Sequence, residues 1–302
     1  TAIKIVRCDA IGERSLARFE REVQLTSRLT HPNTISIYDY GRTEAGVFYY
    51  AMEYLAGMTL EDLVKGSGAQ PPGRVVHILR QVCASLSEAH EMGLIHRDIK
   101  AANVILCERG GLHDVAKVVD FGLVKDIENL SDVTLSAVNT ISGTPHYLSP
   151  EAIRSPSEVD GRSDLYAVGV LGYYLLTGMP LFETQSFVEV CSHHLHTAPI
   201  PPSVRASAPI PPDLEALILR ALEKIPARRP PSARAFQREL EACASAGEWG
   251  EDDARAWWER FSNRLEPRQG PSASDPTLSG TGLSQFSATV VLSHPPGRSA
   301  RP

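Results

Sequence analysis

The stretch that decides the fold is LIHRDIKAANVIL, residues 94–106. Short apolar segments flank a polar centre that contains His96, Arg97, Asp98, Lys100 and Asn103. Asp98 can accept a proton from a hydroxyl, Lys100 can stabilise charge on a nearby oxygen, and Asn103 offers a neutral oxygen ligand for a hard cation. A polar surface loop alone would mean little, but this order of residue types favours a catalytic loop.

A second acidic position follows in VAKVVDFGLVK, residues 115–125. Asp120 ends an apolar strand, and Gly122 allows the backbone to turn sharply after it. Asp120 and Asn103 together would form a two-ligand oxygen site, which is the kind that Mg²⁺ uses when phosphates and water supply the other ligands.

The opening strand TAIKIV, residues 1–6, carries Lys4 among apolar residues. Lys4 could simply be an edge residue with its ammonium in water. However, the helix predicted from Glu13 to Leu29 places Glu22 within its apolar arc, which consists of Leu16, Phe19, Val23, Leu25 and Leu29. A buried carboxylate is costly unless it is paired. We therefore expect a Lys4–Glu22 pair that holds the ammonium for phosphate oxygens.

Several motifs stand in a telling order: AIK (2–4), MEYL (52–55), HRDIKAAN (96–103), DFG (120–122), GTPHYLSPE (143–151), SDLYAVG (163–169) and Arg229 in PARRP. With them, residues 1 to about 245 resemble a eukaryotic-type (Hanks-type) serine/threonine protein kinase of the sort also found in bacteria. The resemblance implies an α+β, two-lobed protein-kinase-like fold. We expect a partial β-rich N-lobe over 1–55, a mostly helical C-lobe over 56–265, and a Pro/Ser/Gly-rich linker or tail over 266–302.

The resemblance also implies a role for each matched residue in transferring the γ-phosphate of ATP to Ser/Thr hydroxyls of proteins. Asp98 would be the catalytic base, Lys100 would lie beside the γ-phosphate, and Thr144 would line the site of the substrate hydroxyl. Lys4, paired with Glu22, would contact the α and β phosphates, and Asn103 and Asp120 would hold Mg²⁺. The adenine site would comprise the gatekeeper Met52, the hinge residues Glu53 and Leu55, and Ile105 under the base.

Three further residues resemble structural parts of the family: the ion pair Glu151–Arg229 and the buried Asp164. Arg97 would read a phosphorylated activation loop, for which Thr134 and Ser136 are the expected autophosphorylation sites. Alternatively, any hydroxyl of that loop could simply be solvated and carry no phosphate.

Bulk properties restrict the other function classes. The 302 residues carry a formal net charge of −6 without a dominant basic stripe, so nothing argues for nucleic-acid binding. The longest apolar run, 165–176, is shorter than the roughly 20 residues that a membrane span needs. Five scattered cysteines favour a reducing compartment, and we expect a cytoplasmic domain whose parent protein could be tethered to a membrane beyond Pro302.

One family feature is missing: no glycine-rich loop precedes the strand of Lys4. We therefore expect the chain to be a fragment whose parent carries that hairpin upstream, with weak ATP binding by the fragment itself. The alternative is a pseudokinase-type scaffold that binds protein partners. The retained set Lys4, Glu22, Asp98, Asn103 and Asp120 favours the enzyme.

Three segments remain. CSHHLHTA (191–198) could bind a metal, but a helix end with a loop is the simpler interpretation. EWGEDDARAWWERF (248–261) could cover an apolar patch of the large lobe or bind a partner. FSATVVLS (286–293) could dock on the domain, although linker sequence is the simpler interpretation. Ser163 is a candidate cap for the apolar helix that follows it.

Overall fold

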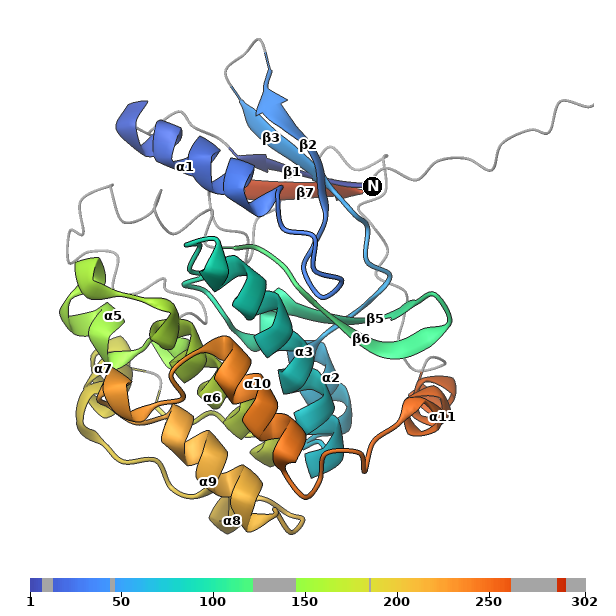
Figure 1. Ribbon diagram of the computed structural model, residues 1–302, viewed down its shortest axis with the longest axis vertical. Helices are drawn as coiled ribbons and strands as arrows, with labels where there is room; N and C mark the ends of the chain where they lie inside the picture. Colours follow the sequence, from blue (N-terminus) through green and yellow to red (C-terminus); the bar gives the residue numbers. More distant parts are fainter. Residues whose placement is uncertain (7–12, 44–46, 122–144, 185, 262–286, 292–302) are drawn as a thin grey trace, which may run out of the picture.

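The smaller lobe is built on a twisted sheet with one long helix. The computed structural model describes residues 1–6, 13–43, 47–121, 145–184, 186–261 and 287–291. Its first sheet has the order β2-β3-β1-β7, with the strands β1 Ala2–Val6, β2 Ile37–Arg42, β3 Phe48–Met52 and β7 Ser287–Val291. Helix α1, Glu13–Thr26, lies beside this sheet (Figure 1). Val23 of α1 packs on Phe48 and Tyr50 of β3 in a small separate core.

The tail contributes a strand to the smaller lobe. β7 pairs antiparallel with β1, so that Lys4 lies opposite Thr289 on one side and opposite Tyr50 of β3 on the other. β1 is therefore an inner strand of the sheet (Figure 1). Of the two interpretations of FSATVVLS, docking is the one that the structure contains.

The larger lobe is mostly helical, and its helices are α2 Leu60–Ser67, α3 Pro72–Glu91, α5 Pro150–Arg154, α6 Gly161–Thr177, α7 Phe187–His196, α8 Pro202–Arg205, α9 Pro212–Ala221, α10 Ala233–Ala242 and α11 Glu251–Phe261. A second sheet, β4 Gly57–Thr59, β5 Val104–Arg109 and β6 Leu112–Val118, lies between these helices and the first sheet (Figure 1). Residues 53–56 join the two sheets, since they connect β3 to β4.

The main core lies between α3 and α6. Leu79, Val82 and Leu86 of α3 and Leu165 and Leu171 of α6 are completely buried. As the apolar sequence of α6 predicts, this helix is buried on nearly all sides. The expected two-lobed α+β architecture is thus confirmed, with a small β-rich lobe and a larger helical lobe.

Two local predictions about the C-lobe can be compared with the structure. The prediction that Ser163 caps α6 is wrong: Asp160 is the N-cap and accepts the backbone N–H of Arg162 at 2.8 Å. Ser163 instead lies inside the first turn and donates to Glu151. Residues 191–196 form the end of α7, and no metal-binding cluster of His, Cys, Asp or Glu exists among the described residues.

The described helices also bear on the question of a membrane span. None of them combines the length and the apolar character that crossing a bilayer requires.

Candidate active site

The loop 96–98 is held from below by the buried carboxylate of Asp164 in α6. Asp164 Oδ2 accepts the backbone N–H of His96 and the ring nitrogen Nε2 of His90, each at 2.8 Å, and Oδ1 accepts the N–H of Arg97 at 2.8 Å. Burial works to raise the pKa of Asp164, but these hydrogen bonds and the charge of His90 outweigh it and hold the pKa below its ordinary value. The carboxylate therefore stays ionised and fixes the loop.

The backbone of this loop is strained at Arg97, and a hydrogen bond to Asp164 restrains it there. Arg97 has φ of +62°, in the left-handed region that non-glycine residues rarely adopt. Such a conformation costs about 1–3 kcal/mol and persists only where the surroundings enforce it. The bond from the Arg97 N–H to Asp164 supplies that restraint.

His96 connects the loop to the strand that leads to Asp120. Its ring is fully buried, Nε2 donates to the carbonyl of Val119 at 3.0 Å, and Nδ1 accepts the N–H of Asp98 at 3.2 Å. Burial lowers the pKa of His96, which keeps the ring neutral as these two opposite roles require. The ring also contacts Phe121, with 4.5 Å between the centroids.

Asp98, Lys100 and Asn103 come together as predicted from their spacing. Lys100 Nζ lies 2.8 Å from Asp98 Oδ2, and Asn103 Nδ2 donates to both Oδ2 and the backbone carbonyl of Asp98 at 2.9 Å. Since the amide nitrogen of Asn103 is used by Asp98, its amide oxygen is the atom available for a cation. A short 3₁₀ turn, Ala101–Asn103, sets this orientation.

Asp120 lies against the sheet of the smaller lobe. Lys4 Nζ is 2.7 Å from Asp120 Oδ1, and Tyr50 Oη donates to the same oxygen at 3.3 Å. Asp120 also has a left-handed backbone, with φ of +57°. Burial, followed by the charge of Asp120, raises the pKa of Tyr50 far above its ordinary value, so the phenol remains a donor.

The cation beside Glu22 is Arg97, whereas we expected Lys4. Arg97 Nη1 lies 4.0 Å from Glu22 Oε1, whereas the ion pair of Lys4 is made with Asp120. The expected Lys4–Glu22 pair is therefore not the arrangement of this structure. The ammonium of Lys4 is instead compensated by the carboxylate of Asp120, 2.7 Å away, so its charge is already paired without Glu22.

The connection 53–56 is fixed through the side chain of Glu53. The Glu53 side chain is 1% exposed, and its carboxylate accepts Lys117 Nζ and Arg109 Nη2, each at 2.6 Å, and the N–H of Ser36 at 2.9 Å. Lys117 is itself buried and also donates to the carbonyl of Thr34. Sequence reasoning missed Lys117 and Arg109; the only signal was a lysine on the apolar strand VAKVV.

The other residues expected around adenine are half-buried: Met52 at the end of β3, Leu55 in the connection, and Ile105 on β5. Ile105 pairs with Thr59 of β4 and with Lys117 of β6. Gly122, Thr134, Ser136 and Thr144 lie outside the described residues. The predicted pair of Arg229 and Glu151 is confirmed, with a two-pronged contact at 2.7 and 2.8 Å.

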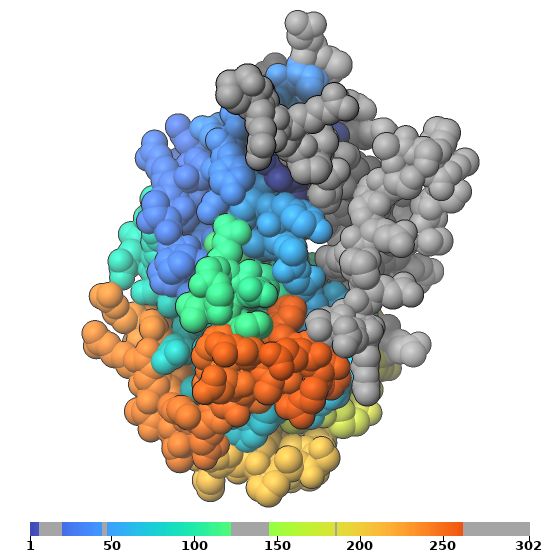
Figure 2. All heavy atoms as spheres, turned by 90° about the vertical axis from the view of Figure 1, so that its right-hand side faces the viewer, coloured from blue at the N-terminus to red at the C-terminus, as the bar shows by residue number. Residues whose placement is uncertain are grey.

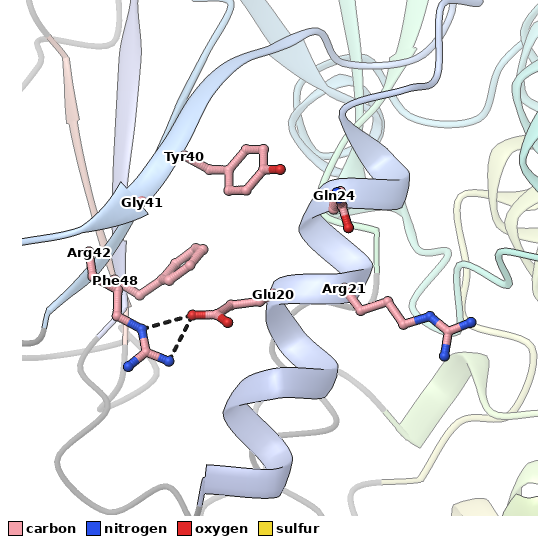
Figure 3. A pocket seen from close by; sticks show the side chains of 7 residues that line it. All are labelled: Glu20, Arg21, Gln24, Tyr40, Gly41, Arg42 and Phe48. Atoms are coloured by element: carbon pink, nitrogen blue, oxygen red, sulfur yellow. Dashed lines mark hydrogen bonds and ion pairs between the residues drawn. The ribbon is translucent and has the colours of Figure 1, made fainter.

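A hollow of about 390 Å³ lies between α1 and the strands β2 and β3 (Figure 3). Tyr40, Arg42 and Phe48 of the sheet and Glu20 and Gln24 of α1 line it. The Glu20–Arg42 ion pair crosses its rim. It contains none of the predicted catalytic residues.

Comparison with known proteins agrees with the geometry. The sequence profile of the protein kinase domain matches residues 1–240, so the chain belongs to the protein kinase family. Curated relatives include the serine/threonine-protein kinases pkn3 of Myxococcus xanthus, with 46% identity, and PknB of Mycobacterium leprae, with 40%, each over 243 residues. PrkC of Bacillus subtilis is 35% identical over 246 residues. Over this region the chain is therefore similar to bacterial serine/threonine-protein kinases.

These matches cover most of this chain but less than half of each relative. They include 80%, 79% and 81% of this chain, but only 44%, 38% and 36% of pkn3, PknB and PrkC respectively. Among solved structures, a double mutant of the PknI kinase domain of Mycobacterium tuberculosis matches with a TM-score of 0.62 and 27% identity, covering 81% of this chain and 85% of that one.

Proposed function

We propose that this chain transfers the γ-phosphate of ATP to serine and threonine hydroxyls of proteins, with Mg²⁺ as the metal. The observation that carries the proposal is the cluster of Asp98, Lys100 and Asn103 on a loop held in a strained conformation by Asp164. A buried carboxylate that enforces backbone strain beside polar residues is typical of a preorganised site.

Each residue of the cluster has a defined task in this proposal. Asp98 accepts the proton of the incoming hydroxyl, and Lys100, 2.8 Å from it, stabilises negative charge on the transferred group. Thr144 would line the site of the hydroxyl. Positioning and charge account for most of the rate enhancement in phosphoryl transfer, because its transition state is loose.

The metal site would use the amide oxygen of Asn103 and the carboxylate of Asp120. Both are hard oxygen ligands, and two protein ligands suffice for Mg²⁺ when phosphates and water complete its shell. When bound, the ion neutralises charge on the phosphate oxygens. Asp120 is now paired with Lys4, so we infer that Lys4 turns from Asp120 toward the phosphates and Glu22 when nucleotide and metal bind.

The adenine would lie between the lobes, against the half-buried side chains of Met52, Leu55 and Ile105, with the backbone of 53–55 as its hydrogen-bonding partner. Support comes from the rigid anchoring of Glu53 by two cations.

We also propose autophosphorylation at Thr134 and Ser136. A cytoplasmic location is supported by the free thiols of Cys83, Cys107, Cys191 and Cys243.

The test is the intact mass of phosphatase-treated chain after incubation with Mg·ATP, beside an Asp120→Ala variant. Phosphate added to the parent chain alone supports the proposal, and peptide mapping then shows whether Thr134 and Ser136 carry it. Equal incorporation in both chains would point to a contaminating kinase. No transfer by the parent to itself or to added protein substrates would refute the proposal for this chain.

A further inference from the structure

Helix α11, which lies beyond the residues matched by the kinase family profile, docks beside the β5–β6 hairpin rather than on the base of the helical lobe. In Figure 1 it lies apart from α9 and α10, next to β6. Figure 2 shows its atoms directly below those of the hairpin. Of the two interpretations of EWGEDDARAWWERF, the structure contains the covering one, with Trp257 and Trp258 packed on the main core.

The contact is built around a buried ion pair. Asp114 of β6 and Arg74 of α3 have completely buried side chains and face each other with two hydrogen bonds of 2.8 Å. The indole N–H groups of Trp249 and Trp258 donate to the same carboxylate at 3.0 and 2.7 Å. The guanidinium lies 3.9 Å from the ring centre of Trp257. We call Arg74, Asp114, Trp249 and Trp258 the indole clamp, and Trp257 lies outside it because it does not bond to Asp114.

The indole clamp satisfies a carboxylate that would otherwise be expensive to bury. Asp114 accepts four hydrogen bonds, all from residues that lie far from it in the sequence. Breaking a buried charge pair is strongly destabilising, because the remaining charge is uncompensated. At Gly73, next to Arg74, an added Cβ would lie 3.0 Å from the backbone of Glu248, so this junction has no spare room.

The strand that carries Asp114 is irregular at that position. The pairing of β5 with β6 shifts register between Cys107 and Arg109, and Asp114 has φ of +52°. A bulge of this kind re-aims a side chain at the cost of regular pairing. Here the side chain of Asp114 contacts Arg74 of α3 together with Trp249 and, in α11, Trp258.

The same hairpin holds the connection between the lobes. Lys117 lies three residues after Asp114 on β6 and Arg109 lies on β5, and their side chains each contact Glu53 at 2.6 Å. We propose that the indole clamp is a positioning device for nucleotide binding. By fixing the bulge it sets the two cations that hold Glu53. The proposal rests on the proposed function, because it assumes that residues 53–55 bind adenine.

The experiment compares tryptophan variants in the full chain. Trp249→Phe and Trp258→Phe, alone and combined, remove the donors to Asp114 but keep the aromatic cover. Trp257→Phe is the matched control, since Trp257 stacks on Arg74 without bonding to Asp114. Three readouts are needed: melting temperature, hydrogen exchange of the amides of residues 53–56, and KM for ATP against kcat.

We expect exchange at 53–56 to accelerate about tenfold or more in the double variant, KM for ATP to rise three- to tenfold, and kcat to change less than twofold. Trp257→Phe should lower the melting temperature without these effects. If exchange and KM are unchanged in the single and double variants while the melting temperature falls, α11 is only a cover and the proposal is wrong. A parent chain that binds no ATP would refute the proposed function, whereas the exchange readout would still decide this proposal. Should the double variant not fold, the Trp258→Phe chain decides in the same way.

Discussion

Replacing Asp164 by Asn should separate the folding role of this residue from its role in the active site. The carboxylate accepts three hydrogen bonds, two at Oδ2 and one at Oδ1. An amide has only one acceptor oxygen, so the least costly orientation places it where Oδ2 lies. The N–H of Arg97 then loses its partner and faces an amide N–H instead.

The size of the effect follows from these contacts. An N–H that loses its partner in a partly buried contact costs about 1–3 kcal/mol, and two bonds that lose charge assistance weaken by about 0.5–1 kcal/mol each. We therefore expect the free energy of unfolding to fall by about 3 kcal/mol. Arg97, at φ of +62°, would also lose its restraint and relax, which displaces the neighbouring Asp98. A misplacement of about 1 Å can reduce a rate about 100-fold.

The assay combines urea unfolding with steady-state phosphate transfer. Asp160→Asn is the matched control, because Asp160 caps the same helix and Asn caps helices equally well. We expect Asp160→Asn to change stability by less than about 1 kcal/mol and to leave kcat unchanged. The reasoning is refuted if Asp164→Asn matches the control in stability, or if it loses stability while keeping the parent kcat.

Three further predictions concern pH, the C-lobe and the metal. Burial lowers the pKa of His194 to about 3, whereas the same side chain in the unfolded chain has a pKa of about 6.5. As the pH falls below about 6.5, the unfolded chain therefore binds a proton at His194 while the folded chain does not, which favours unfolding. Stability should fall between pH 6.5 and 4.5 by up to about 1.4 kcal/mol per pH unit more in the parent than in His194→Asn, and equal slopes in chemical unfolding would contradict this. Arg229→Met should cost about 3–5 kcal/mol by stranding Glu151, while Arg228→Met, at an exposed position, should cost less than about 0.5 kcal/mol in the same assay. Asn103→Ala should raise the Mg²⁺ concentration for half-maximal transfer about tenfold, equivalent to about 1.4 kcal/mol, and an unchanged Mg²⁺ titration would remove Asn103 from the metal site.

The parts of the site that the sequence predicts are those set by local spacing. Asp98, Lys100 and Asn103 lie within six residues, and a single turn brings them together. The buried Asp164 and the Arg229–Glu151 pair were also predictable, because the family motifs that contain them are long and specific. The mostly helical C-lobe follows from apolar residues at helical spacing in α3 and α6.

What escaped prediction depends on contacts between distant segments. The partner of Lys4 depends on how close α1 and Asp120 each approach β1, and 116 residues separate Lys4 from Asp120. In the sequence LHDVAKV, Asp114 looks like an ordinary polar residue of a strand. Only in the folded hairpin, at the register shift of its pairing, does it contact α11, and the sequence does not predict that shift. Likewise, the pairing of β7 with β1 depends on which strand lies beside the available edge of the sheet. A short apolar segment does not by itself predict its partner strand.

The most direct measurement of the central claim is phosphate transfer from ATP to a matched set of peptides that differ only in a Ser, Thr or Tyr acceptor. The parent chain should phosphorylate the Ser and Thr peptides and not the Tyr peptide. Asp98→Asn, which keeps the shape of the side chain but cannot accept the proton, should reduce the rate about 100-fold or more. Transfer by Asp98→Asn at the parent rate, or preference for the Tyr peptide, would contradict the account.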